Sequence, residues 1–252
     1  GRKMGCINSS LIPCQFLRAH AGETMKKSFV VAIDGPSGAG KSTVSRLLAQ
    51  KLEGVLLDTG GMYRSVAYFA LKSGAKTEAE FGKIARGLSF DLKPGSHAVF
   101  VNGEDLGHRL RNQKVSGMAS YVSKFKEVRD VLTRRQRALG RKWSRKAPVV
   151  VEGRDIGTAV FPSVEFKFFV TADAKVRALR RYHELKRHAG KKVTLKRILK
   201  ENIARDLQDS DRKIAPLRCS KDAVVVDTSH MGIVQVVKFM IDHIRGHNLL
   251  VP

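Results

Sequence analysis

Residues 35–42, with the sequence GPSGAGKS, match the pattern G-x-x-x-x-G-K-[ST] at every constrained position. Glycines at this spacing let the backbone wrap around phosphate oxygens with its N–H groups pointing inward, and the N-terminus of the following helix adds partial positive charge. In such a loop Lys41 reaches the β- and γ-phosphates, and the hydroxyl of Ser42 ligates Mg²⁺. The sequence therefore predicts a site for ATP or GTP, with Mg²⁺ as cofactor, formed by Gly35, Pro36, Ser37, Gly38, Ala39, Gly40, Lys41, Ser42 and Thr43.

A phosphate-binding loop alone does not distinguish a kinase from a GTPase, a helicase or a transport ATPase. A kinase with a phosphorylated acceptor brings roughly six negative charges together, so arginines must neutralise them while water is excluded. Arginines follow two predicted strands here: Arg64 comes after the strand at 55–57, and Arg154 comes with Asp155 after the strand at 149–151. Because ligands bind at the carboxyl ends of parallel strands, we expect these side chains to meet at one edge of the sheet.

Two further sets of charged residues have helical spacing. One set is spaced i, i+3, i+4 and should share one face of a helix: Arg177, Arg180 and Arg181. The other is spaced i, i+4, i+7 and should share one face of a later helix that ends at Ala215-Pro216: Arg205, Asp209 and Arg212. Both sets favour a phosphotransferase with two phosphorylated substrates. The alternative is that these charges lie on ordinary solvated helix faces.

The elements that must position these residues alternate between short apolar runs and helical stretches. Near-continuous apolar residues predict five buried strands, at 29–33, 55–57, 149–151, 164–170 and 223–226. Apolar residues at helical spacing predict helices at 41–52 and 63–71. This order predicts an α/β protein whose five-stranded parallel sheet is covered by helices on both faces.

The segment 80–123 interrupts that alternation. Asn102-Gly103 separates two short apolar runs, and both residues accept the positive φ angles of a type I′ turn, which predicts a hairpin. We therefore expect a small antiparallel lobe at 80–123, inserted into a core that consists of 25–79 and 124–252.

Residues 1–24 carry no periodic apolar face and no acidic residue before Glu23. We expect them to form a disordered N-terminal extension that contributes little to stability. A basic, acid-poor targeting segment is the alternative interpretation.

The composition excludes several classes of protein. Hydrophobic residues make up 42% of the chain and charged residues 28%, a balance that excludes a disordered protein. No apolar run is long enough to cross a membrane, and the three cysteines lack metal-ligand spacing, so we expect free thiols, a cytoplasmic location and no membrane partner. The net charge of +24 implies attraction to polyanions. Because no nucleic-acid-binding motif accompanies the basic runs at 134–146 and 175–200, we expect no obligatory nucleic-acid partner.

From about residue 25 to the C-terminus, the chain resembles the bacterial-type cytidylate kinases. The resemblance is carried by residues 33–42 (IDGPSGAGKS), 58–64 (DTGGMYR), 134–137 (RRQR), 153–162 (GRDIGTAVFP) and 205–217 (RDLQDSDRKIAPL). The last two motifs are specific to this family. The resemblance implies a P-loop kinase fold with a monophosphate-binding insert and a helical lid at about 174–212. It also implies an enzyme that transfers the γ-phosphoryl group of ATP to CMP and dCMP. We expect this enzyme to be a monomer.

The same resemblance implies a role for each matching residue. The acceptor phosphate would be held by Ser37, Arg64 and Arg154. The cytosine edge would be read by Ser120, Arg129, Asp155 and Arg212. The pentose would be contacted by Arg205 and Asp209. The lid would close over the transferring group with Arg177, Arg180 and Arg181, and the catalytic set would be Lys41, Arg154, Arg177 and Arg181.

Two departures and two alternatives stay open. Thr59 and Glu152 stand where the family more often has serine and aspartate, and Glu152 alters a contact behind the site. One alternative is a P-loop kinase for another small acceptor, such as AMP, UMP or shikimate. The other is a nucleic-acid-dependent ATPase, which the net charge suggests.

Overall fold

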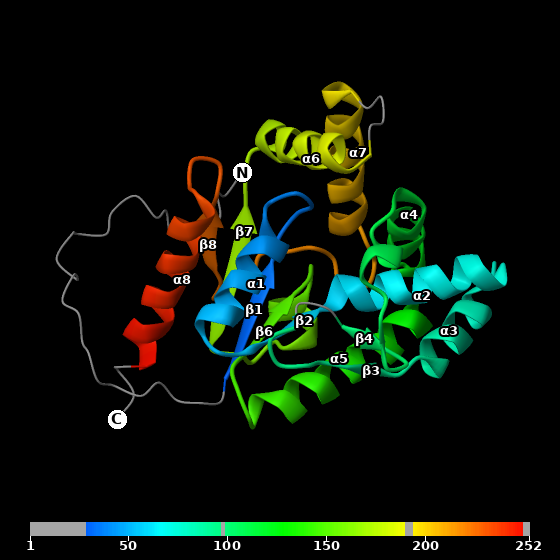
Figure 1. Ribbon diagram of the computed structural model, residues 1–252, viewed down its shortest axis with the longest axis horizontal. Coiled ribbons are helices and arrows are strands. Elements are labelled where there is room, and N and C mark those ends of the chain that lie inside the picture. Colours follow the sequence, from blue (N-terminus) through cyan, green and yellow to red (C-terminus); the bar gives the residue numbers. More distant parts are fainter. Residues whose placement is uncertain (1–28, 97–98, 190–193, 249–252) are drawn as a thin grey trace.

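The computed structural model describes residues 29–96, 99–189 and 194–248. Its centre is a five-stranded parallel sheet in the order β2-β6-β1-β7-β8 (Figure 1). The strands are β1 (Val30–Asp34), β2 (Val55–Asp58), β6 (Val149–Glu152), β7 (Phe166–Thr171) and β8 (Val224–Asp227). The predicted α/β class and five-stranded parallel sheet are confirmed. The expected extension at 1–24 lies outside the described residues.

Helices cover both faces of the sheet because its strands are apolar on both sides. Helices α1 (Lys41–Lys51) and α8 (Ile233–Asn248) share a buried cluster with one face, in which Val44 and Met240 pack near Ile33. Helices α2 (Thr59–Ser73) and α5 (Lys126–Ser144) share a second cluster with the other face, in which Met62 and Leu132 pack near Val151. The sheet is thus the middle layer of three, as Figure 1 shows.

Helix α2 begins at Thr59, earlier than the predicted start at 63. The reason is a cap: the carboxylate of Asp58 accepts a hydrogen bond from the backbone N–H of Gly61 at 2.8 Å. Helix α3 (Glu78–Gly87) begins with a capping box formed by Thr77 and Glu80. Helix α4 (Gln113–Val122) packs against α2 at the far side of the molecule from α8 (Figure 1).

A small antiparallel sheet lies between α3 and α4 in the sequence, as predicted. It consists of β3 (Phe90–Asp91), β4 (Phe100–Val101) and β5 (Glu104–Asp105), followed by a 3₁₀ turn at Gly107–Leu110. The turn between β4 and β5 has φ angles of 51° at Asn102 and 85° at Gly103. Both angles are positive, so the hairpin inferred from Asn-Gly is confirmed.

Helices α6 (Ala174–Ala189) and α7 (Leu195–Ser210) pack on each other above the carboxyl ends of the strands (Figure 1). The prediction that α7 continues to Ala215-Pro216 is wrong, because α7 ends at Ser210. The chain turns back there: the N–H of Leu217 donates to the carbonyl of Asp209 at 2.8 Å, and Ala215 has a φ of 45°. Arg212 therefore lies outside the helix.

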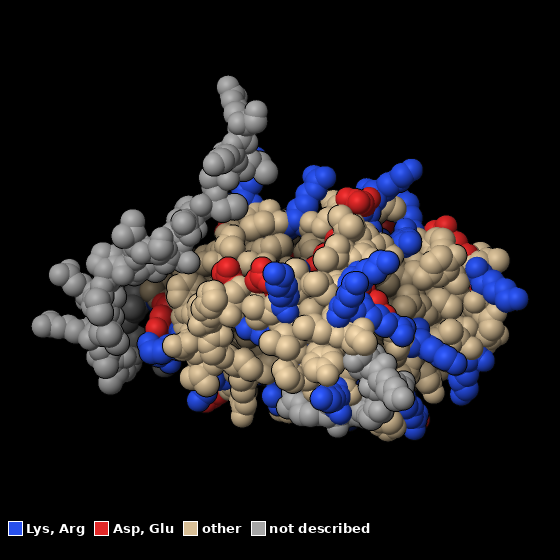
Figure 2. All heavy atoms as spheres, turned by 90° about the horizontal axis from the view of Figure 1, so that it is seen from above, with Lys and Arg blue, Asp and Glu red and all other residues tan. Residues whose placement is uncertain are grey.

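Two arginines of the first basic run serve the fold. Arg135 donates to the carbonyls of Leu88 and Arg86, and Arg137 donates to those of Val160 and Ala159. Seen from the α6–α7 end, Lys and Arg side chains project at separate points over the face rather than in one stripe (Figure 2). Within the described ranges, no helix is both long enough and apolar enough to cross a membrane.

Candidate active site

The phosphate loop joins the end of β1 to the start of α1, the setting that the motif predicts. Gly35 has a φ of 142°, and a Cβ built there would lie 2.0 Å from the carbonyl oxygen of Val170 on β7. Gly40 caps α1 with a φ of 89°. Only glycine fits these two positions, so the loop shape depends on the residue types in the motif.

Lys41 is buried under the loop. Its Nζ donates to the carbonyl oxygen of Pro36 at 2.7 Å. Burial and, to a smaller extent, the nearby positive charge of Arg154 lower the pKa of Lys41 to about 7, against the opposing effects of Glu152, Asp34 and Asp209. These neighbours place the lysine at the meeting point of the loop and the strand ends.

Three carboxylates stand in a row at the carboxyl edge of the sheet. In the strand register, Glu152 pairs with Ile33 on one side and with Asp58 on the other, and Asp34 follows Ile33. Asp34 accepts hydrogen bonds from the N–H groups of Ile156 and Gly157 at 2.8 and 2.7 Å. Burial nevertheless raises the pKa of Asp34 to about 6, because desolvation outweighs these two bonds. The carboxylate holds the short π-helical turn at Ile156–Val160 against β1.

Glu152 faces the start of α1. The hydroxyl of Ser42 donates to its Oε1 at 2.8 Å, whereas its Oε2 is buried and has no hydrogen-bond partner among the described residues. Burial raises the pKa of Glu152, and the charge of Asp58 acts in the same direction. A hydroxyl and an unpaired carboxylate oxygen beside a phosphate loop are the donor types that Mg²⁺ prefers, so these residues fit that ion.

Arginines and carboxylates gather on the other side of the loop. Arg154 donates from Nε to Asp209 on α7 at 3.1 Å. Nη1 of Arg212 lies 3.8 Å from the second oxygen of Asp209, although Arg212 is outside the helix. Arg64 binds Asp58 at 2.5 Å. The strand-edge residue Arg154 thus meets helix α7 through Asp209.

Helix α7 also meets α4 in this region. The amide of Gln208 donates to the hydroxyl of Ser120 at 2.6 Å, and Arg205 reaches the carbonyl of Ser116 at 3.5 Å. Arg129 of α5 pairs with Asp155 in the interior behind them. Arg212 lies close enough to Arg129 and Asp155 for their charges to act on it, whereas Ser120 contacts Gln208 of α7.

The three lid arginines have different partners. Arg177 is buried and binds the carbonyl of Ser37 in the phosphate loop. Arg180 donates to the hydroxyl and carbonyl of Thr228, next to the loop. Arg181 forms an exposed ion pair with Glu184. In this arrangement Arg177 and Arg180 lie against the loop, and Arg181 does not.

Sequence reasoning assigned no role to three residues that contact this site. They are Asp34, Glu152 as the partner of Ser42, and Asp206, which contacts both Ser37 and Arg177. Asp34 and Asp206 lie within two of the quoted motifs, and Glu152 immediately precedes a third, which is the signal that could have pointed toward them.

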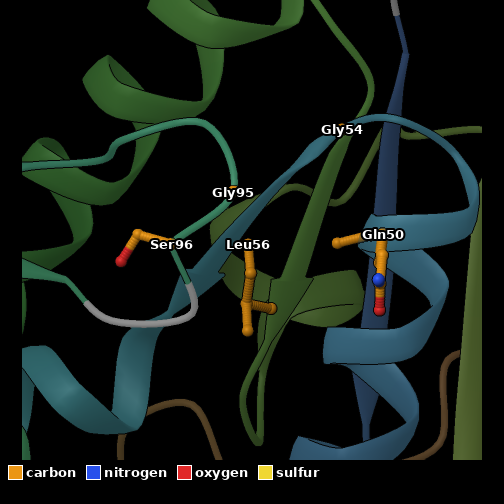
Figure 3. Close-up of a pocket in the computed structure, with 6 residues that line it drawn as sticks. Gln50, Gly54, Leu56, Gly95 and Ser96 are labelled. Carbon is orange, nitrogen blue, oxygen red and sulfur yellow. The ribbon is translucent and has the colours of Figure 1, made fainter.

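A separate hollow lies at the opposite end of α1 and β2, next to the turn that contains Gly95 (Figure 3). Its lining has no charged side chain, and it is formed by Ala49, Gln50, Gly54, Leu56, Gly95 and Ser96. Because the last turn of α1 borders it, whereas the phosphate loop precedes the first turn, it is not part of the nucleotide site.

The chain is similar to known proteins over most of its length. The family described as cytidylate kinase matches residues 31–246. A cytidylate kinase of Syntrophotalea carbinolica is 45% identical over 223 residues, which cover 86% of this chain and 92% of the relative. One of Bacillus velezensis is 41% identical over 216 residues, covering 84% and 94%. A bifunctional pantoate ligase/cytidylate kinase of Prochlorococcus marinus is 38% identical over 246 residues, covering 96% of this chain and 46% of that relative.

The fold and the site together define a P-loop kinase: a phosphate loop at the carboxyl edge of a parallel sheet, faced by an arginine-bearing helical lid. The family match and the sequence identities above show which family of P-loop kinases this is. The chain belongs to the cytidylate kinase family.

Proposed function

We infer that this protein transfers the γ-phosphoryl group of ATP to CMP and dCMP, giving CDP and dCDP. Membership of the cytidylate kinase family supports this function. The structural observation that carries it is the contact between Arg154 and Asp209, which joins the strand edge to the lid beside Lys41. An ATPase that acts on water would not need arginines to bind a second phosphorylated substrate.

The donor side of the site is assigned to the phosphate loop. Its backbone N–H groups and Lys41 would bind the phosphates of ATP. Ser42 and Glu152 would hold Mg²⁺, and the unpaired Oε2 of Glu152 supports this assignment. When bound, Mg²⁺ neutralises charge on the β- and γ-phosphates.

The acceptor side is assigned from the resemblance to the cytidylate kinase family, residue by residue. Arg64 and Arg154, with the hydroxyl of Ser37, would hold the phosphate of CMP. Arg205 and Asp209 would contact the pentose. The cytosine edge would be bound by Ser120, Arg129, Asp155 and Arg212.

The chemistry needs positioning and charge neutralisation rather than proton abstraction. The phosphate oxygen of CMP is already ionised near pH 7, so it attacks the γ-phosphorus in line without a general base. Arg177 and Arg181 are assigned to the transferring group. For Arg181 this requires that the side chain leave its exposed ion pair with Glu184.

A panel of acceptors tests the function. ADP release would be measured with ATP and, separately, CMP, dCMP, UMP, AMP and shikimate, and CMP and dCMP should give the largest kcat/KM. A larger value with another acceptor would reassign the substrate. ATP hydrolysis that RNA or DNA stimulates, with steep salt dependence, would support the nucleic-acid-dependent ATPase instead. We further propose that the protein acts as a monomer in the cytoplasm, which sedimentation and cell fractionation would test.

A further inference from the structure

Asp206 lies against the phosphate loop but outside the set of side chains assigned to either substrate. Its Oδ1 accepts a hydrogen bond from the backbone N–H of Ser37 at 3.2 Å, and its Oδ2 lies 2.5 Å from Nη1 of Arg177. The same Nη1 donates to the carbonyl oxygen of Ser37 at 2.9 Å. The three residues form a closed ring of hydrogen bonds, in which both backbone polar groups of Ser37 are bound by charged side chains of the lid.

Arg177 is also held by contacts outside the ring. Nε of Arg177 donates to the carbonyl of Ala172, just after β7, at 2.9 Å, so the guanidinium is fixed at three points. A Cβ built on Gly38 would lie 3.2 Å from the carbonyl oxygen of Arg177 and 3.3 Å from its Cβ. Helix α6 thus packs directly on the loop, and little solvent reaches the pair, since the side chains of Arg177 and Asp206 are 9% and 19% exposed.

Helix α7 presents two carboxylates to two different partners. Asp206 faces the donor loop at Ser37, and Asp209, three residues later, faces Arg154 on the acceptor side. By contrast, the pair of Arg197 with Glu201 on the same helix is exposed and contacts neither side. Asp206 is therefore placed to connect the lid with the loop rather than to stabilise α7 alone.

We infer that Asp206 is a positioning residue for phosphoryl transfer. It fixes the backbone of Ser37 and the guanidinium of Arg177 in one arrangement, so that the packing of α6 and α7 on the phosphate loop sets the shape of the loop. The inference rests on the proposed kinase function. Because Asp206 already binds the N–H of Ser37, ATP would be bound by the other N–H groups of the loop. A displacement of about 1 Å at reacting groups is enough to lower a rate about 100-fold.

The first test compares Asp206→Asn with Glu201→Gln, which removes the same charge from an exposed position on the same helix. For Asp206→Asn, kcat with CMP should fall about 10- to 100-fold, as expected for loss of a charge-assisted hydrogen bond. The Kd for MgATP, measured by calorimetry without acceptor, should stay within about threefold. Glu201→Gln should leave all these quantities unchanged. Asp206→Glu keeps the charge but moves it, so its kcat should fall less than that of Asp206→Asn. If Asp206→Asn does not fold, Asp206→Glu takes its place in the test.

The second test is a double-mutant cycle with Arg177→Gln. If the two residues act as one unit, the double variant should be no slower than the slower single variant. Full activity of Asp206→Asn would overturn the inference, and so would additive losses in the double-mutant cycle. A third contrary result is much tighter MgATP binding with unchanged kcat, because Asp206 would then be an anion that competes with the phosphates of ATP for the loop. Failure of the proposed function is distinguishable, because the unsubstituted chain would then prefer another acceptor, and the variants would be compared with that acceptor.

Discussion

Arg129 and Asp155 form an ion pair in the interior, with Nη2 and Oδ2 2.5 Å apart and side chains only 4% and 9% exposed. The guanidinium also donates to the carbonyl of Ser123 at 3.2 Å and lies over the ring of Tyr63, 5.7 Å from its centroid. Burial raises the pKa of Tyr63 to about 12, so its hydroxyl stays protonated at neutral pH. Because the Tyr63 hydroxyl carries no negative charge, the ion-pair partner of the Arg129 guanidinium among the described residues is Asp155.

Removing one partner of this pair should destabilise the fold. Asp155→Leu would leave the guanidinium buried without a counter-charge, which typically costs about 3–5 kcal/mol. Arg129→Met combined with Asp155→Leu should recover much of that loss, because apolar residues of similar volume replace both charges. Urea denaturation measures the stabilities. If the pair also contacts cytosine, the stable double variant should bind CMP weakly and retain MgATP binding. A CMP affinity equal to that of the unsubstituted protein would show that the pair has a structural role alone.

Lys41→Ala should preserve the fold and abolish most transfer. Loss of one preorganised cationic donor lowers kcat by roughly 10²–10³-fold or more. Lys51→Ala, at the exposed far end of the same helix, is the matched control and should be fully active. Steady-state kinetics and circular dichroism on both variants give the answer, and near-normal turnover of Lys41→Ala would reject the assigned phosphate loop.

Asp209→Ala should affect the acceptor and not the donor. The carboxylate binds Arg154 and is assigned to the pentose, so its loss should lower kcat/KM for CMP by about 10- to 100-fold. The KM for ATP should stay within a few-fold. Asp211→Ala, an exposed position just beyond α7, serves as the control. An effect confined to the KM for ATP would contradict the assignment to the acceptor side.

The pKa of Asp34 makes a prediction about pH. The pKa of Asp34 is about 6 in the folded protein, above the ordinary value of 3.8, so between about pH 4 and 6 the folded protein holds a proton that the unfolded chain has released. Stability from this group is complete below pH 4 and is lost as the pH rises through 6, by about 3 kcal/mol. Asp34→Asn should flatten this part of the stability profile, as measured by urea denaturation from pH 4.5 to 7.5. An unchanged slope would show that Asp34 has an ordinary pKa in the folded protein.

Features with a local cause were predictable from the sequence. The five strands, the phosphate loop and the Asn102-Gly103 hairpin depend on runs of apolar residues or on backbone angles that few residue types accept. Boundaries were less accurate: β7 begins at Phe166 rather than at 164, and α2 starts early because Asp58 caps it.

The remaining features depend on contacts between distant parts of the chain. Residues spaced i+7 give the same pattern whether or not the helix continues, so Arg212 looked helical although the backbone turns after Ser210. The partners of Ser37 and Ser42, which are Asp206 and Glu152, are 169 and 110 positions away along the chain. The sequence near either serine does not predict such a contact, because the contact arises from tertiary packing.

The strand order has a consequence for how the protein is synthesised. In the finished sheet β6 lies between β2 and β1, so these two strands never pair with each other. After β1, the phosphate loop and β2 have been translated, the ribosome must still translate the chain up to β6, which begins at Val149 and pairs with both strands. At about 5–20 residues per second this takes at least several seconds. During that time the nascent chain exposes two apolar strands without their shared neighbour, and exposed apolar strands of this kind are prone to aggregate.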